Sequence, residues 1–225
     1  GIWRIFDVFD KYNVKATFSC CSLALENSPW LIDEILTRNH EISAHGVKWI
    51  SHAYLSKEEE KQIINDCYSS ILKLSGHPPV GWHTKSSTSP FTRDLLIEHG
   101  GFTYDSNAYN DDIPYVLKKN DQKLVIIPYS FDTNDMRYDG NNGFVHGDDF
   151  NIYCKESFNQ LLSETDDGSL RMMSIGLHPR IIGRPGRIKG LEDFIKYIKT
   201  YENVWIPKRM DIAKYCLEKD SFNFF

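Results

Sequence analysis

The stretch MSIGLHPRIIGRPGR, residues 173–187, ends a short apolar run with His178 and continues with three arginines. Histidine titrates near neutral pH and can act as a general acid or base. Arginine presents a planar fork of N–H donors that suits carbonyl and carboxylate oxygens. We therefore expect His178 to transfer protons and Arg180 and Arg184 to bind substrate. Arg187 is expected to bind a structural carboxylate.

A second group of polar residues lies in FDTNDMRY, residues 131–138. Asp132 and Asp135 form a paired-carboxylate cluster with Asn134 between them. One interpretation is catalytic: a carboxylate activates water or orients a histidine, and Asn134 stabilises developing charge. The other is a loop in which Asp and Asn side chains bond their own backbone. The sequence favours neither.

Further polar and aromatic side chains follow the other apolar runs. His45 follows EISA and is a candidate catalytic residue, although a hydrogen-bonded structural histidine is an equally good reading. In barrels of parallel strands, chemistry is found where the strands end. The other polar and aromatic residues at strand ends could contact substrate, or they could form turns after a strand or fill the core. The candidates for substrate contact are Trp49, Trp82, Tyr104, Asp105 and Ser106.

Short β-rich runs alternate with helical patterns of ten to twenty residues along the chain. This order favours parallel βαβ units, and the lack of a GxGxxG turn favours a barrel over a dinucleotide-binding sheet. We therefore predict an α/β fold, a distorted (β/α) barrel. Strands are expected at 14–21, 40–44, 79–84, 102–106, 124–130, 171–178 and 204–209. Helices are expected at 1–12, 28–38, 56–76, 89–101, 148–163, 190–201 and 210–219, and 107–121 is expected to be a polar loop.

The composition is that of an ordinary globular protein. With 225 residues, 41% hydrophobic and 25% charged, we expect a single domain over residues 1–225. A formal net charge of -5 argues against a nucleic-acid partner, and no apolar run is long enough to span a membrane. The five cysteines lack CxxC spacing, so we expect reduced, mostly buried thiols. The sequence shows no charged segment followed by an apolar run and a small-residue cleavage site, so we expect a cytoplasmic location.

Several of these motifs together resemble a known family. HEISAHG at 40–46, the Asp-rich VIIPYSFDTNDMRY at 125–138, and the pair Leu177-His178 resemble the second, fourth and fifth motifs of the polysaccharide deacetylase family. The family fold is a distorted (β/α) barrel. PVGWHTKSSTSPFTRDLLIEHGGFTYDSNAYNDDIPY and GLHPRIIGRPGR are similar to the branch that holds the metal-independent allantoinases of bacterial urate catabolism.

This resemblance implies a hydrolase of carbon–nitrogen bonds that opens a cyclic amide or ureide such as allantoin, in purine catabolism. The wider family, which acts in carbohydrate metabolism, implies an alternative: a metal-dependent N-deacetylase of polysaccharides or chito-oligosaccharides. An inactive truncated remnant of the family is a third reading. The expected partner is a small-molecule substrate, and a homo-oligomer is left open.

The sequence departs from the sugar deacetylases at their metal site. In that pattern an aspartate near the first strand and two histidines at i and i+4 hold a divalent metal. His45 matches the first histidine, but Trp49 stands at i+4 and only His52, seven residues on, could replace it. A catalytic metal normally needs about three protein ligands. We therefore expect no metal cofactor, with zinc held in part by His45 as the alternative.

The start of the chain also departs from the family pattern. The first family strand and its acidic motif precede the kind of helix with which GIWRIFDVFDKY opens this sequence. We expect the domain to be incomplete at its N-terminus, and the activity of the 225-residue chain to depend on that missing part.

Overall fold

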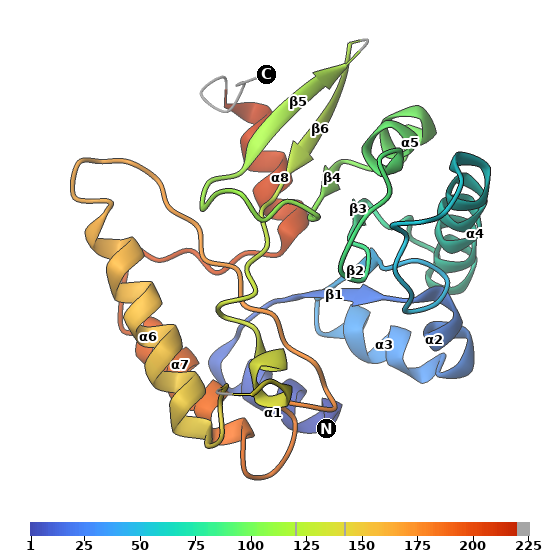
Figure 1. Ribbon diagram of the computed structural model, residues 1–225. Helices are drawn as coiled ribbons and strands as arrows, with labels where there is room; N and C mark the ends of the chain where they lie inside the picture. The colour runs from blue at the N-terminus through green and yellow to red at the C-terminus, as the bar shows by residue number, and fades with distance from the viewer. Residues whose placement is uncertain (120, 142, 220–225) are drawn as a thin grey trace. The chain divides into compact units, whose positions relative to one another are not determined.

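The computed structural model describes residues 1–119, 121–141 and 143–219 (Figure 1). These residues form two compact units. The helical unit comprises Gly1–Val14 and Tyr129–Ile206, and the sheet unit comprises Lys15–Pro128 together with the chain from Pro207 onward. The prediction of one domain over the whole chain stays a prediction.

The sheet unit is built on six strands in the order β1-β2-β3-β4-β6-β5 (Figure 1). Neighbouring strands are parallel except β5, which runs antiparallel to β6 at the edge. The predicted α/β architecture is therefore confirmed, and within the described residues the sheet does not close into a barrel. The strands are β1 (Thr17–Cys20), β2 (Glu41–Ala44), β3 (Gly81–Trp82), β4 (Tyr104–Asp105), β5 (Tyr115–Lys119) and β6 (Gln122–Ile126).

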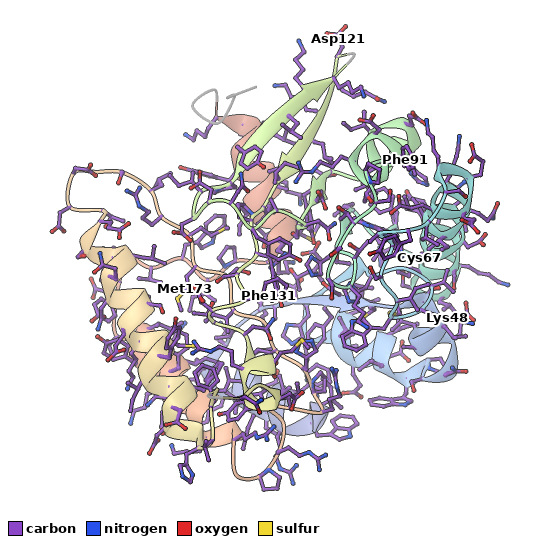
Figure 2. All side chains as sticks on the ribbon, in the orientation of Figure 1. Lys48, Cys67, Phe91, Asp121, Phe131 and Met173 are labelled. Carbon is purple, nitrogen blue, oxygen red and sulfur yellow. The ribbon has the colours of Figure 1, made fainter. Side chains whose placement is uncertain are left out.

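Helices follow the strands of this unit as the alternation predicts. The helices α3 and α4 contact β2, α5 contacts β6, and α8 contacts the β5–β6 hairpin, whose tip carries Asp121 (Figure 2). No helix among the described residues is long and apolar enough to cross a bilayer. The bounds are α2 (Ser22–Asn27), α3 (Trp30–Thr37), α4 (Lys57–Ser75), α5 (Thr92–His99) and α8 (Arg209–Glu218).

The ends of α4 show why the sequence predicted it well. Ser56 Oγ accepts a hydrogen bond from the Glu59 N–H at 3.3 Å, and the Glu59 carboxylate accepts one from the Ser56 N–H at 2.8 Å. This capping box satisfies backbone donors that a helix start otherwise leaves unpaired.

Cys67, on the inner face of α4, is fully buried, and burial raises the pKa of its thiol to about 12 (Figure 2). All five cysteines are free thiols and four are buried, as predicted.

The helical unit contains α1 (Ile2–Tyr12), the 3₁₀ helix η1 (Asp135–Asp139), α6 (Gly147–Ser163) and α7 (Ile188–Ile198). The helix α7 packs against both α6 and α1. Lys11 on α1 forms an ion pair with Glu192 on α7 at 2.5 Å. The unit has no extended strand among its described residues. Its one β-contact is an isolated parallel bridge between Asn134 and Gly176.

Three predicted elements differ from the structure. The predicted strand 171–178 is reduced to the bridge at Gly176, because within the described residues only Asn134 forms a β-bridge with this segment. The segment 204–209 forms no strand, and Pro207 lacks the N–H that a ladder needs. The predicted loop 107–121 contains β5, whose sequence YVLKK ends in two lysines that suit an exposed edge strand.

Two glycines bring the starts of α6 and α7 close together. A Cβ added to Gly190 would overlap the carbonyl group of Gly147, whereas one added to Gly186 would meet nothing within 4 Å. Gly190→Ala is therefore expected to lower the free energy of unfolding by about 1–3 kcal/mol, since overpacking forces backbone shifts. Urea unfolding measures the loss. Gly186→Ala is the control and is expected to change stability by less than about 1 kcal/mol; equal effects of both variants would contradict the close packing.

Candidate active site

A carboxylate–histidine dyad lies in the helical unit. Asp135 is fully buried at the start of η1, and its Oδ1 lies 2.6 Å from His178 Nδ1. Its Oδ2 accepts the backbone N–H groups of His178 at 2.6 Å and Ile182 at 3.1 Å. One carboxylate therefore holds both the ring of His178 and the backbone on either side of Pro179. Hydrogen bonds to a charged acceptor are stronger than neutral ones, so this arrangement is rigid.

The contact with Asp135 determines which nitrogen of His178 carries a proton. An ionised carboxylate only accepts hydrogen bonds, so Nδ1 is the protonated nitrogen and, in the neutral ring, Nε2 holds the lone pair. The His178 side chain keeps 20% of its surface exposed, whereas that of Asp135 is fully enclosed. A buried carboxylate beside an accessible imidazole stabilises the imidazolium that forms when Nε2 takes a proton. The pair can thus act as a general base and then as a general acid.

The backbone around Asn134 brings the two halves of the dyad together. The Asp135 N–H donates to the Gly176 carbonyl at 2.9 Å, and the Gly176 N–H donates to Thr133 at 3.2 Å. Asn134 Oδ1 accepts the Met136 N–H, and its Nδ2 donates to the Tyr129 hydroxyl, both at 2.8 Å. Asn134 is 1% exposed, so its contacts are those of a structural cap for η1. They do not support the predicted contact with substrate.

The two aspartates of FDTNDMRY have different environments. Asp135 is enclosed in the dyad, whereas Asp132 is exposed and its carbonyl oxygen accepts a hydrogen bond from Arg137 at 3.2 Å. Among the described residues the Asp132 carboxylate has no recorded partner. Asp135 therefore contacts a histidine, whereas Asp132 lies in an exposed loop. A catalytic role for either aspartate stays a prediction.

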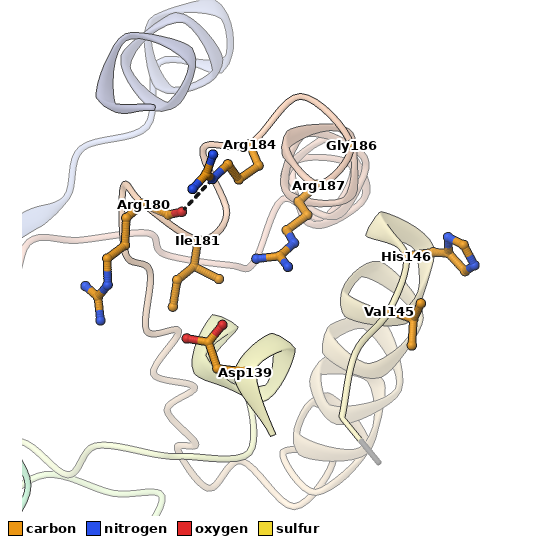
Figure 3. A pocket seen from close by; sticks show the side chains of 8 residues that line it. All are labelled: Asp139, Val145, His146, Arg180, Ile181, Arg184, Gly186 and Arg187. Atoms are coloured by element: carbon orange, nitrogen blue, oxygen red, sulfur yellow. Dashed lines mark hydrogen bonds between the residues drawn. The ribbon is translucent and has the colours of Figure 1, made fainter. Parts of the chain in front are cut away.

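Arg180 and Arg184 line a pocket of about 610 Å³ within the same unit (Figure 3). Arg184 Nε donates to the Arg180 carbonyl oxygen at 3.1 Å. Arg187 also lines the pocket, and its guanidinium stacks 4.3 Å from the centre of the Tyr138 ring. The prediction that Arg187 binds a structural carboxylate is wrong: among the described residues its recorded contact is this aromatic face. Substrate binding by Arg180 and Arg184 stays a prediction.

The sheet unit carries a second pair of interest, His45 and His83, at the ends of β2 and β3. Their rings stack in parallel, 5.3 Å apart with 3° between the planes. His45 Nδ1 bonds the His83 carbonyl oxygen, and His83 Nδ1 bonds the Ser106 carbonyl oxygen at 2.8 Å. Each neutral ring therefore has its lone pair on Nε2. The sequence assigned no role to His83. Like His45, it lies at the end of a predicted strand, and this shared position is the signal that could have linked the two histidines.

Four predicted substrate contacts are core residues in the structure. Trp82, Tyr104, Asp105 and Ser106 are each 0% exposed. The Tyr104 hydroxyl donates to the buried Glu41 carboxylate at 2.8 Å. Glu41 also accepts the Met210 N–H at the start of α8 at 3.0 Å, so this network ties α8 to the sheet. Direct substrate contact by these four side chains is not supported.

Asp105 forms a polar network inside the sheet unit. Its carboxylate accepts hydrogen bonds from Arg93 at 3.1 Å and from the Asn107 N–H at 3.0 Å. Burial raises the pKa of Asp105 above its ordinary value of 3.8, and Arg93 opposes part of that effect. The folded state therefore binds a proton more tightly than the unfolded state does at this position.

The raised pKa of Asp105 gives stability a pH dependence. As pH rises from 3.8 through the raised pKa, the free energy of unfolding is expected to fall, because the folded protein must lose the proton that it holds more tightly. Asp105→Asn removes this contribution. The unfolding free energy of the variant minus that of wild type is therefore expected to increase with pH across this window in urea titrations. A difference that does not vary with pH would contradict the shift.

Trp49 and His52 belong to the loop after β2. The Trp49 side chain is 40% exposed, and Lys85 Nζ lies 4.3 Å from its ring centre, so a role at a pocket edge stays a prediction. His52 is 1% exposed, and its Nδ1 bonds Glu60 at 2.9 Å. His52 thus pairs with α4, and it belongs to no group of three or more candidate metal ligands among the described residues.

The donor chemistry does not fit the divalent metal site of the sugar deacetylases. Within residues 1–119, 121–141 and 143–219, no group of three or more His, Cys, Asp and Glu side chains is placed to hold an ion. His45 has Trp49 at i+4, and an indole is not a metal ligand. About three protein ligands are the usual minimum for a catalytic zinc.

Comparisons with known proteins give the family. Residues 1–96 match the family model described as polysaccharide deacetylase. A Schizosaccharomyces pombe protein named as a polysaccharide deacetylase is 34% identical over 230 residues, which cover 95% of this chain and 72% of that protein. The chain belongs to the polysaccharide deacetylase family. The α/β fold expected from the resemblance is therefore confirmed.

Two further relatives of this chain are named for different activities. The crystal structure of the allantoinase PuuE superposes with a TM-score of 0.93 at 37% identity, covering 99% of this chain and 74% of that one. A peptidoglycan deacetylase of Helicobacter pylori is 25% identical over 92% of this chain and 80% of its own length. The family thus places the chain among hydrolases of carbon–nitrogen bonds without naming its substrate.

Proposed function

We propose that the protein hydrolyses the carbon–nitrogen bond of a cyclic amide or ureide, with allantoin as the substrate. The observation that carries the proposal is the buried carboxylate of Asp135 held 2.6 Å from Nδ1 of the part-exposed His178. Such a pair can transfer protons as a general base and then as a general acid. The 37% identity to the allantoinase PuuE supports the choice of substrate. The corresponding setting is cytoplasmic purine catabolism.

The dyad supplies both proton transfers that ring opening needs. His178 Nε2 takes a proton from water as the water oxygen attacks the ring carbonyl carbon, while Asp135 stabilises the imidazolium. His178 then returns the proton to the ring nitrogen as the carbon–nitrogen bond breaks. The products of this step are a carboxyl group and a free N–H on the opened ring.

Charge that develops on the carbonyl oxygen requires a donor. Of the candidates from the sequence, Asn134 is poorly suited to this role because it is 1% exposed and its amide bonds Tyr129 and Met136. We assign the role to Arg180, whose exposed side chain lies two residues after His178. Its guanidinium is always charged and presents several N–H groups.

The alternative is metal-dependent N-deacetylation of an acetylated polysaccharide. The similarity to the Helicobacter pylori peptidoglycan deacetylase favours it. The donor set around His45 and Trp49 argues against it, because that chemistry requires a held metal.

A comparison of two substrates tests the proposal. The purified 225-residue chain is incubated with allantoin and with a chito-oligosaccharide, and ring opening and acetate release are measured. We expect ring opening and no acetate release. Acetate release that depends on added zinc, without ring opening, would assign the protein to the N-deacetylases. Inactivity toward both, in a chain that unfolds cooperatively, would favour the inactive remnant.

A further inference from the structure

The pocket of about 610 Å³ in the helical unit shares two chain segments with the dyad. Asp139 ends the 3₁₀ helix that Asp135 begins, and Ile181 belongs to the segment that follows His178. Figure 3 shows the Ile181 side chain between Arg180 on one side and Arg187 on the other, with Asp139 beneath. The pocket is therefore part of the same local structure as the catalytic pair.

The pocket has an excess of positive charge. Three guanidinium groups line it, against the single carboxylate of Asp139. Among the described residues, neither Arg184 nor Arg187 forms a recorded ion pair, and neither does Asp139. The Tyr138 ring lies against the Arg187 guanidinium at 4.3 Å and limits its movement. A guanidinium held in this way is prepared for a planar oxyanion and loses little freedom on binding.

Two helices begin at this pocket. His146, the N-cap of the 17-residue helix α6, and Arg187, the N-cap of the 11-residue helix α7, both line it (Figure 3). A helix start carries a partial positive charge that favours anions. The first turn of α6 already holds Asp148 and Asp149, whereas that of α7 holds no acid. The start of α7 therefore adds to the field of the arginines.

Asp139 limits which anions the pocket suits. In Figure 3 its carboxylate points toward Ile181, between Arg180 and Arg187. A carboxylate repels a simple anion but accepts hydrogen bonds from N–H groups. A ligand that satisfies both sides has an oxyanion at one end and N–H donors at the other.

We infer that this pocket binds a small carboxylate that also carries N–H donors, the chemical class that opening of a cyclic ureide produces. The inference rests on the proposed function and extends it to the product. Water adds to the ring carbonyl, the carbon–nitrogen bond breaks, and the opened molecule bears a carboxylate and a ureido group. The carboxylate binds Arg187 and Arg184, and the ureido N–H groups bind Asp139.

Calorimetric titration of the 225-residue chain tests the assignment with three probes: N-carbamoylglycine, acetate and inorganic phosphate. The variants are Arg187→Gln, Arg184→Gln and Asp139→Asn. Lys196→Gln, which removes one exposed positive charge from α7 outside the pocket, is the matched control. Thermal unfolding of each variant shows that it is folded.

N-carbamoylglycine is expected to bind more tightly than acetate or phosphate. Loss of a charge-assisted hydrogen bond in Arg187→Gln or Arg184→Gln is expected to raise its Kd by ~10- to 100-fold. Asp139→Asn is expected to raise the Kd of N-carbamoylglycine and not that of acetate. Lys196→Gln is expected to leave both unchanged. Equal Kd values in folded variants and control, or phosphate as the tightest probe, would overturn the inference.

The same titration separates this inference from the proposed function. Ring opening of allantoin by a chain that does not bind N-carbamoylglycine overturns the product pocket and leaves the function standing. Binding at the arginines by a chain that opens no ring supports the ligand class and overturns its assignment as a reaction product.

Discussion

His178→Ala is expected to reduce kcat for allantoin ring opening by ~10² to 10⁴-fold, the usual contribution of a positioned general acid–base group. The reason is the loss of Nε2, the nitrogen that exchanges a proton with water and with the leaving nitrogen. KM is expected to change little, because the imidazole acts mainly in the transition state. Initial rates at several allantoin concentrations measure both parameters.

His77→Ala is the matched control, since His77 is exposed on the sheet unit and outside the dyad. The control is expected to keep the wild-type rate. If His178→Ala also kept that rate while folded, His178 would have no role in proton transfer.

Asp135→Asn is expected to lower kcat by a similar ~10² to 10⁴-fold while preserving the shape of the residue. The amide of asparagine has one acceptor oxygen where the carboxylate of Asp135 has two. The imidazole of His178 therefore loses its orientation and the negative charge that stabilises its protonated form. The backbone N–H groups of His178 and Ile182 also lose an acceptor. We therefore expect a loss of about 1–3 kcal/mol in unfolding free energy as well.

The pH profile of kcat/KM separates a positioning role of Asp135 from a purely structural one. Loss of the carboxylate is expected to change the acidic limb of this profile, because the imidazolium is no longer stabilised. Asp132→Asn is the control, with an exposed carboxylate, and is expected to keep the wild-type rate and profile. An unshifted profile in Asp135→Asn would reduce Asp135 to a structural residue.

Most of the helices could be predicted from the sequence because their signals are local, although the short helix α2 (Ser22–Asn27) was not. The capping box at Ser56 and Glu59 and the glycine stop at Gly76 mark both ends of α4 within the sequence itself. Strands depend on distant partners. The apolar segment 171–178 finds one bridging residue instead of a ladder, and the polar segment 107–121 contains an edge strand because β6 lies beside it.

The site could be predicted in part. The position of His178 after an apolar run predicted this imidazole as a candidate, but the sequence could not show which of Asp132 and Asp135 contacts it, because that depends on the backbone path that buries Asp135. Strand-end position alone did not show which way a side chain faces. Trp82 and Tyr104 were named for that position, and both point into the core. The buried partner of Tyr104, Glu41, is distant in sequence and gave no signal.

The most direct test of the account is the rate of allantoin ring opening by the 225-residue chain after treatment with a chelator. Product formation is followed with and without added zinc, and His178→Ala is run beside wild type. If Asp135 and His178 carry the chemistry, chelated wild type keeps its rate, zinc adds nothing, and the variant loses activity. Ring opening that vanishes on chelation and returns with zinc would contradict the account.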